Sequence, residues 1–237
     1  MNPIIKQLLL LLGLLPVTGF VTHAPRSLTI QFKHKMGSRE LQLFNESYVN
    51  PFGEPVTITR FKYYLSHFSI TGAGEKETAL SDKTFLIDES APESKTLTFS
   101  TSVTTPQSLS FVIGVDSSLN VSGVQTGSLD PLNGMFWTWN SGYIFARLEG
   151  KSDSSHAPAH LLNWDVGGFK TPFNASRKIT LDLSHATGPV ITIEADLLKW
   201  FNAMHAIQIA QAPLCHQPGR LAMQLADNYS RMFSIAL

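Results

Sequence analysis

The feature that most constrains this chain is the alternation of apolar and polar residues with a period of two. The segment RSLTIQFK places Leu28, Ile30 and Phe32 on one face of an extended chain, and SLSFVIGV and KITLDL repeat the pattern. Further strand-like runs, each bounded by turn-forming residues, are PVTITRFKYYLSHFSI, TFLID, KTLTF, GYIFARLE and VITIEA. These runs leave little room for the helices that cross over a parallel sheet. The sequence therefore predicts an all-β fold, an antiparallel β-sandwich.

Helical signals are confined to the last quarter of the chain. Asp196 is a candidate N-cap for the run LLKWFNAMHAIQIAQ, and Pro218 stands just before GRLAMQLADNYSRMF, where a first-turn proline is tolerated. In that second run Leu221, Leu225 and Met232 fall near one side of a helix. We therefore expect one or two C-terminal helices to pack on the sandwich.

The first residues are typical of a targeting segment. Lys6 precedes the apolar run LLLLLGLLPVTG, which fits a secretory signal peptide over residues 1–19. That run is too short to span a bilayer, and no later run approaches the roughly 18 apolar residues that a span requires. The sequence predicts a single domain over residues 20–237 that is exported, either periplasmic or secreted, and that does not insert into the membrane.

Charge and motif content exclude several functions. Lys plus Arg and Asp plus Glu are both 18, so the basic surplus expected of a nucleic-acid-binding protein is absent. The chain has no HExxH, CxxC, P-loop or GxSxG motif, which favours a binding protein over an enzyme. Cys215 is the only cysteine and cannot form an internal disulfide. It is a small buried apolar thiol, is paired with a thiol outside the chain, or is a soft thiolate ligand.

The least charged stretch runs from residue 100 to residue 146 and contains only Asp116 and Asp130 as charged residues. Two carboxylates in such a setting could bind a cation, or each could cap a turn, beside Gly114 and Pro131 respectively. The stretch ends in DPLNGMFWTWNSGY, which gathers four aromatic residues, Phe136, Trp137, Trp139 and Tyr143. Such a cluster could form a binding site or could simply cover one face of a sheet.

The run GVDSSLNVSGVQTGSLDPLNGMFWTWNSGYIFARLEG, at residues 114–150, resembles the MbnP-like family of exported copper-binding proteins. The segments FKHKMG, TITRFKYYLSHFSI, DVGGF and LADNYSRMF follow in the order expected of that family, so the resemblance covers nearly the whole domain. Members are associated with methanobactin systems and with di-haem peroxidase-like partners. The resemblance implies a β-sandwich that binds one copper ion, Cu(I) or Cu(II). In some members the ion lies beside a tryptophan that the haem partner has oxidised to kynurenine.

The chemistry of that modification is consistent with a copper ligand. Opening the indole ring creates an aromatic amine, a nitrogen donor that tryptophan lacks, and imidazole completes a site suited to copper. We place the modified position within WTW, preferring Trp139 to Trp137, since alternation puts both side chains on one face of an extended chain. Asp116, Asp130 and Tyr143 are expected to support the site.

The remaining ligands are expected among the histidines. His34 matches the FxH pattern of the family, with a structural core histidine as the alternative. His205 lies on the first predicted helix, and His216 follows it beside the cysteine. His160 stands four residues after His156, but the proline between them favours an exposed loop over a helix.

One position departs from the family pattern. Many members carry a histidine where this chain has Asp165, just before the Gly-Gly of DVGGF. An oxygen donor suits Cu(I) poorly. Asp165 stays among the candidate ligands, and the departure implies that the site in this chain is rearranged, has recruited His160, or has lost metal binding.

Two main functions follow from these observations. The first is an exported copper-binding protein that buffers, delivers or senses copper. The second is a sandwich module that recognises a sugar or a protein with an exposed aromatic platform at residues 136–143. A structural surface protein without a small ligand is a third possibility. Burial of the indoles beside imidazole rings favours the first function, and an exposed aromatic shelf favours the second.

Overall fold

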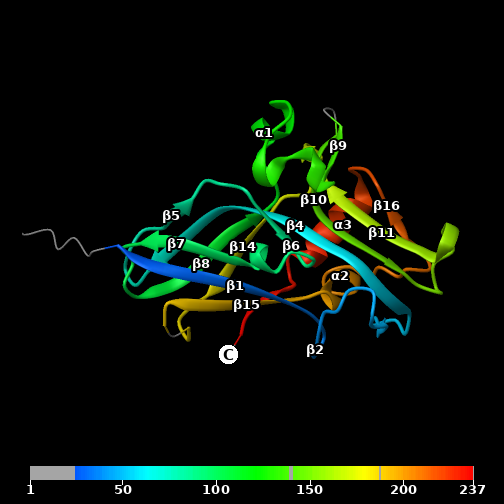
Figure 1. The fold of residues 1–237 in the computed structure, drawn as a ribbon, viewed down its shortest axis with the longest axis horizontal. Coiled ribbons are helices and arrows are strands. Elements are labelled where there is room, and N and C mark those ends of the chain that lie inside the picture. Colours follow the sequence, from blue (N-terminus) through cyan, green and yellow to red (C-terminus); the bar gives the residue numbers. More distant parts are fainter. Residues whose placement is uncertain (1–24, 139–140, 187, 237) are drawn as a thin grey trace, which may run out of the picture.

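Two β-sheets face each other across an apolar interior in the computed structural model, which describes residues 25–138, 141–186 and 188–236 (Figure 1). The smaller sheet has the order β17-β15-β1-β2, and β7 also pairs with β1. Its strands are β1 (Arg26–Met36), β2 (Arg39–Glu40), β7 (Thr96–Thr101), β15 (Val190–Asp196) and β17 (Phe233–Ile235).

The larger sheet has the order β14-β8-β4-β10-β11-β16. These strands are β14 (Arg177–Asp182), β8 (Pro106–Ile113), β4 (Pro55–Gly72), β10 (Gly142–Lys151), β11 (Leu161–Gly167) and β16 (Leu214–Cys215). Short strands extend it: β3 (Tyr48–Val49), β5 (Thr78–Ser81) and β6 (Phe85–Asp88) pair with β4, and β9 (Phe136–Thr138) pairs with β10. Two further strands, β12 (Phe169–Lys170) and β13 (Phe173–Asn174), form a separate small ladder.

The predicted β-sandwich with C-terminal helices is confirmed, and the sheets are mixed rather than wholly antiparallel. Strand β1 pairs in parallel with β15, from Thr29 opposite Val190 to Lys35 opposite Asp196. Strand β16 pairs in parallel with β11. Both partners are distant in sequence, so the intervening strands of the fold make the crossover that a dedicated helix makes in an α/β protein.

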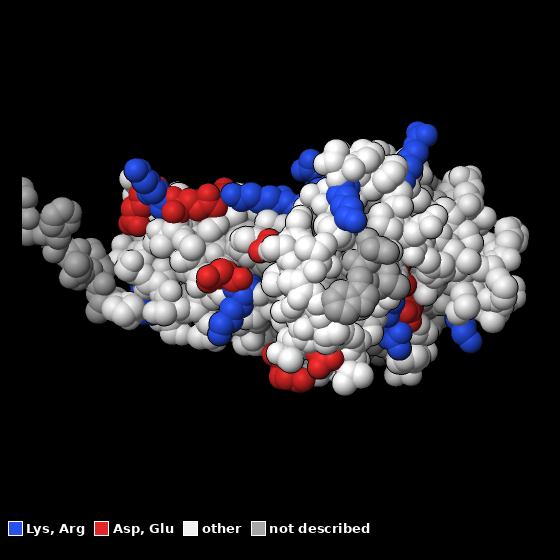
Figure 2. All heavy atoms as spheres, turned by 90° about the horizontal axis from the view of Figure 1, so that it is seen from above, with Lys and Arg blue, Asp and Glu red and all other residues white. Residues whose placement is uncertain are grey.

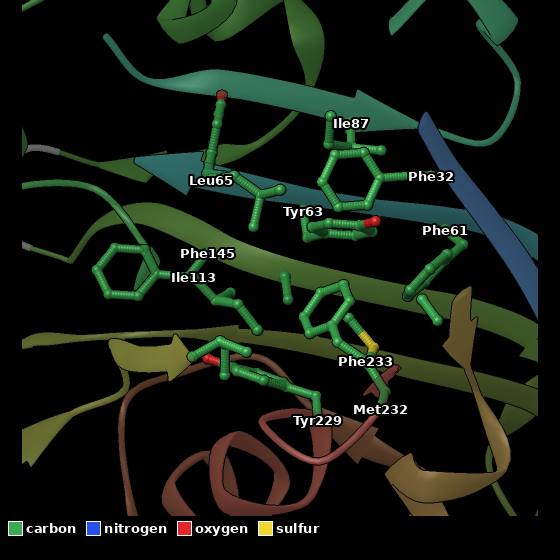
Figure 3. Packing of buried hydrophobic residues seen from close by; sticks show 14 of the residues in the cluster. Phe32, Phe61, Tyr63, Leu65, Ile87, Ile113, Phe145, Tyr229, Met232 and Phe233 are labelled. Carbon is green, nitrogen blue, oxygen red and sulfur yellow. The ribbon is translucent and has the colours of Figure 1, made fainter. Parts of the chain in front are cut away.

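The apolar positions of the period-two pattern form the core. Leu28, Ile30 and Phe32 of β1 are all buried, as the alternation predicts. Phe32 crosses the interior to contact Tyr63 of β4 and Phe111 of β8 edge-on, with ring centroids 6.4 and 6.3 Å apart. Figure 3 shows Phe32 and Tyr63 in this interior from close by.

Of the two predicted C-terminal helices, the second forms, and the first forms only over the four residues of α2. The last helix is α3 (Arg220–Tyr229), which packs against β11 and the short helix α2 (Leu198–Phe201). The helix predicted after Asp196 is wrong beyond residue 201. The buried Glu54 carboxylate accepts the amides of residues 209 and 210, and the Asn228 side chain accepts those of residues 204 and 205. These side chains replace the hydrogen bonds that a helix would have made, so tertiary contacts override helix propensity.

Residues 117–138, called the lobe below, rise from the larger sheet (Figure 1). The lobe contains α1 (Ser117–Val121), two single-turn 3₁₀ helices, η2 (Gly127–Leu129) and η3 (Pro131–Asn133), and strand β9. Two other such turns, η1 (Pro92–Lys95) and η4 (Pro158–His160), lie elsewhere. Within the described ranges no helix combines the length and apolarity needed to cross a membrane. The predicted signal peptide, residues 1–19, lies outside the described residues.

Candidate functional site

One indole of the WTW segment lies directly on strand β11. A Cβ atom added at Gly167 would come 3.0 Å from Cζ3 of Trp137 and 2.5 Å from the carbonyl oxygen of Tyr143. Glycine at this position therefore allows the indole and the β10 backbone to approach the strand closely. This contact explains the first glycine of DVGGF. The other tryptophan of the segment, Trp139, lies outside the described residues.

Asp165 lies on the same face of β11, two residues before Gly167. Its carboxylate accepts two hydrogen bonds from Arg147 of β10, from Nε at 2.5 Å and from Nη2 at 2.9 Å. Nη1 of Arg147 donates to the carbonyl oxygen of Gly134 at 2.7 Å, in the segment that leads into β9. The ion pair of Arg147 with Asp165 is almost fully buried. It therefore fixes the hairpin of β9 and β10, which carries Trp137, to β11.

His216 follows strand β16 and approaches the same carboxylate. Its Nδ1 lies 3.7 Å from Oδ2 of Asp165, which is beyond hydrogen-bond length, and its side chain is 50% exposed. Within the described part of the chain no hydrogen bond fixes this ring. Trp137, Asp165, Gly167 and His216 are called the β11 site below. The structure thus brings an indole of WTW and an imidazole distant in sequence to one face of one strand.

Cys215 is buried beside this site. Burial raises the pKa of its thiol to about 11, so the thiol stays protonated at neutral pH. Its strand neighbour is Trp164, which is also buried. Of the three interpretations, the small buried thiol is the one that the structure supports.

His34 is buried and has a hydrogen-bond partner at each ring nitrogen. Nδ1 lies 2.5 Å from a carboxylate oxygen of Glu89, and Nε2 lies 2.8 Å from the hydroxyl of Tyr63. Burial lowers the pKa of this imidazole, which favours the neutral ring. Metal binding at His34 would require the loss of one of these hydrogen bonds. The structure therefore supports a structural role for His34 in the core, which was the alternative to metal binding.

The other predicted ligands lie apart from one another. His205 is in a loop instead of a helix, and its Nε2 lies 3.0 Å from Asp227. His160 is the exposed last residue of the single 3₁₀ turn η4, where no longer helix forms, with a left-handed backbone and Nδ1 3.2 Å from the Ser155 carbonyl oxygen. Across residues 25–138, 141–186 and 188–236, no three His, Cys, Asp or Glu residues are grouped as a metal site requires.

The predicted supporting residues serve local structure. Oδ1 of Asp130 accepts the amide of Leu132 at 2.9 Å and caps η3, as the turn interpretation predicts. The Asp116 carboxylate lies 2.5 Å from Nε2 of His67. Tyr143 is fully buried and its hydroxyl donates to the Leu129 carbonyl oxygen, so its predicted place in an exposed aromatic platform is wrong.

Two residues of this region, Arg147 and Gly167, were not among the predicted site residues. Arg147 is the only charged residue of the apolar segment GYIFAR, and a charge in such a strand indicates a buried partner. Gly167 belongs to a glycine pair directly after a strand, which is a signal for close backbone approach. Neither signal identifies the partner, because the contacts join segments distant in the sequence.

The family model MbnP matches residues 25–217. The chain belongs to the MbnP family. Its fold is similar to that of a solved structure, MbnP from Methylosinus trichosporium, with a TM-score of 0.58 and 17% sequence identity. The match covers 75% of this chain and 78% of the other, and at this identity it shows a shared fold. No curated protein matches the sequence. In general terms, the MbnP family is one of copper-related proteins associated with methanobactin.

Proposed function

We propose that this MbnP family member is an exported protein that binds copper at the β11 site. The observation that carries the proposal is the placement of Trp137 and His216 on the face of β11 that bears Asp165. His216 is half-exposed and is held near a carboxylate without a hydrogen bond, so its imidazole is available to a metal. His34, whose ring nitrogens are both engaged, is left out of the ligand set.

The proposed ligands are nitrogen atoms. His216 supplies an imidazole, and the second donor is the aromatic amine of a kynurenine formed from Trp137 or Trp139. We propose that His216 donates to the nearby Asp165 carboxylate once the ion is bound, and that Asp165 is not itself a ligand, because both of its oxygens already accept hydrogen bonds from Arg147. A carboxylate placed behind a ligating imidazole orients the ring and raises its basicity. This arrangement revises the expectation that Asp165 is itself a ligand.

We propose that a di-haem peroxidase-like partner forms the kynurenine at the lobe. The lobe carries a single charged residue, Asp130, and exposes Val121, Val124 and Leu132, the last with 92% of its surface accessible. Figure 2, which looks down on this side of the molecule, shows few charged side chains over it. A weakly charged projection that exposes three apolar side chains and carries the tryptophan segment suits a protein partner that oxidises that segment.

The proposed role is binding and not catalysis. The β11 site holds one imidazole that belongs to no relay of nucleophile and base within the described residues. Recognition of a sugar on an aromatic platform is less well supported, because Phe136 packs on the buried Tyr143 with ring centroids 4.9 Å apart. Storage, delivery and sensing all remain consistent with one copper ion at the edge of the sheet.

Intact-mass measurement and metal analysis test the proposal on protein purified with its haem partner. We expect about one copper ion per chain and a mass increase equal to the loss of one carbon and the gain of one oxygen. Either Trp137→Phe or Trp139→Phe should abolish both signals, and the other substitution should leave the mass increase in place. Unmodified mass with copper bound would disprove the kynurenine, and unchanged copper in both variants would disprove the site.

Leu132→Glu tests the partner separately. The substitution places a charge on the most exposed apolar side chain of the lobe and should slow tryptophan oxidation by the haem partner without unfolding the protein. Leu214→Glu, at an exposed leucine of β16 outside the lobe, is the matched control. Equal oxidation rates in the two variants would contradict docking at the lobe.

A further inference from the structure

One of the five tyrosines differs from the others in the partner of its hydroxyl group. Four hydroxyls donate to backbone carbonyl oxygens, in the pairs Tyr48 with Glu40, Tyr64 with Ser128, Tyr143 with Leu129 and Tyr229 with Ala175. The hydroxyl of Tyr63 instead lies 2.8 Å from Nε2 of His34. A carbonyl oxygen is too weak a base to take a proton, whereas a neutral imidazole takes one readily.

The network behind His34 sets the tautomer of the ring. Although burial alone raises the pKa of Glu89, hydrogen bonds from His34 and Lys95 lower it below its usual range, so the group is a carboxylate at neutral pH. A carboxylate only accepts hydrogen bonds, and Nδ1 of His34 must therefore carry the ring proton. Nε2 is then an unprotonated acceptor that faces the hydroxyl of Tyr63.

A path of aromatic rings leads from this tyrosine to Trp164, the residue before Asp165 on β11. Trp164 precedes Asp165 on β11 and projects into the core, where its indole lies parallel to that of Trp200, with centroids 6.4 Å apart and planes inclined by 4°. The Trp200 ring contacts Phe61 at 6.0 Å, and Phe61 contacts Tyr63 at 5.2 Å. All four side chains are fully buried. Figure 3 shows Phe61 and Tyr63 side by side in the core.

We propose that Tyr63 is a redox-active residue at the end of a relay through Trp164 and Trp200, which carries oxidising equivalents from the β11 site into the core. A one-electron oxidant at the surface, such as a ferryl haem or an oxidised metal complex, takes one electron from Trp164 and is itself reduced. Trp200 donates an electron to the Trp164 radical cation and becomes a radical cation itself. Tyr63 then gives one electron to the Trp200 radical cation and its hydroxyl proton to Nε2 of His34. The products are two intact indoles, a neutral tyrosyl radical and an imidazolium paired with Glu89.

Tyr229 provides an internal comparison. Its ring lies closer to Trp200 than Phe61 does, with centroids 5.2 Å apart. Its hydroxyl, however, donates to the Ala175 carbonyl oxygen at 2.6 Å and has no base to receive the proton. Oxidation of this tyrosine would leave a protonated radical in a buried apolar setting, which is strongly unfavourable. Proximity alone would select Tyr229, whereas proton acceptance selects Tyr63.

The inference depends on aromatic contacts and hydrogen bonds, and it stands or falls independently of copper binding. Once the tryptophan of the WTW segment has been oxidised, no unmodified indole remains at the β11 site to react with further oxidant. The relay would then move oxidising equivalents away from this site and into the core. It would thus protect the site from further oxidation.

Flash photolysis of a labelled protein tests the relay. A thiol-reactive ruthenium tris-bipyridine complex is attached in the Cys215→Ala/Gln217→Cys background, because residue 217 is exposed and close to β16. An electron acceptor then generates the oxidised complex, and transient absorption and electron paramagnetic resonance follow the radicals. We expect an indolyl signal that is replaced by a tyrosyl signal. The absence of any tyrosyl signal would overturn the proposal.

Two tyrosine variants in the same background identify the radical. Tyr63→Phe should abolish the tyrosyl signal and prolong the indolyl signal, whereas Tyr229→Phe should behave like the parent. His34→Gln, which keeps an acceptor but removes the base, should also prolong the indolyl signal. Circular dichroism confirms that each variant is folded. Persistence of the tyrosyl signal in Tyr63→Phe, or its loss in Tyr229→Phe, would overturn the assignment.

Discussion

Two histidines of this protein, His34 in the core and His216 at the β11 edge, each lie beside a carboxylate but differ in what their nitrogens can do. In His34 both nitrogens are hydrogen-bonded and the ring is buried. In His216 the nearest carboxylate oxygen is 3.7 Å away and half of the side chain is exposed. The carboxylate beside His34 is bound by a lysine, and that beside His216 is bound twice by an arginine.

The difference separates a histidine that stabilises the fold from one that is available to a ligand. A satisfied, buried imidazole contributes to stability and can exchange protons only with its own partners. A partly exposed imidazole with a carboxylate held behind it can rotate toward an incoming ion at small cost. Both histidines were predicted from the sequence as copper ligands. Their different availability to a metal arises from the groups that each imidazole contacts in the fold.

Removal of each imidazole gives the sharpest contrast. His34→Ala should lower the free energy of unfolding by about 3 kcal/mol, because the hydroxyl of Tyr63 and a carboxylate oxygen of Glu89 lose a buried partner. His216→Ala should change it by less than about 0.5 kcal/mol. Urea denaturation measures both values. Equal losses in the two variants would remove the basis of the comparison.

Gly167→Ala tests how tightly the hairpin is seated on β11. The new Cβ would lie 2.5 Å from the backbone oxygen of Tyr143 and 3.0 Å from the Trp137 indole, so we expect a loss of about 2 kcal/mol. The matched control is Gly219→Ala, where a Cβ meets nothing within 4 Å, and the loss there should be below about 0.5 kcal/mol. Trp137 fluorescence should shift in the first variant alone. A tolerated alanine at residue 167 would contradict the close contact.

A smaller part of the contribution of His34 depends on pH. Burial lowers the pKa of the ring below its usual value near 6.5, so the unfolded chain binds a proton more readily than the folded one. Stability should therefore fall as pH falls below about 6.5. The lowered pKa of Glu89 acts in the same direction at lower pH, and Lys95, Lys62 and Asp88 are the other charged groups nearby.

Urea denaturation between about pH 7.5 and about pH 5.5 measures this dependence. The wild-type protein should lose stability over the interval, and His34→Gln should lose less of it, because glutamine does not titrate. A variant with the same pH slope as the wild type would show that His34 is not the group responsible.

The smallest expected effect is at Cys215. Cys215→Ala removes one buried sulfur and should cost about 1 kcal/mol, with copper binding unchanged. The pKa of about 11 also predicts slow alkylation of the native thiol at neutral pH and rapid alkylation after unfolding. A loss of copper in this variant would return the thiol to the ligand set.

The strands and the core could be predicted from the sequence because alternation is a local signal. The runs that became β1, β4, β8 and β14 each carry it, and most of their apolar positions are buried. The helix expected after Asp196 failed because Glu54 and Asn228, both distant in sequence, bind the amides that the helix would have used. The aromatic segment and the glycine pair were evident as sequence features. The ion pair of Arg147 with Asp165, which joins them, was not, since neither residue indicates its partner.

Copper content after dialysis, measured in the wild-type protein and in two histidine variants, tests the central claim most directly. His216→Gln and His205→Gln each replace a partly exposed imidazole that lies near an aspartate, so they are matched. The account predicts about one copper ion per chain in the wild type and in His205→Gln, and a loss of at least about tenfold in affinity in His216→Gln. Undiminished copper in His216→Gln, or a protein that binds no copper after reaction with its haem partner, would contradict it.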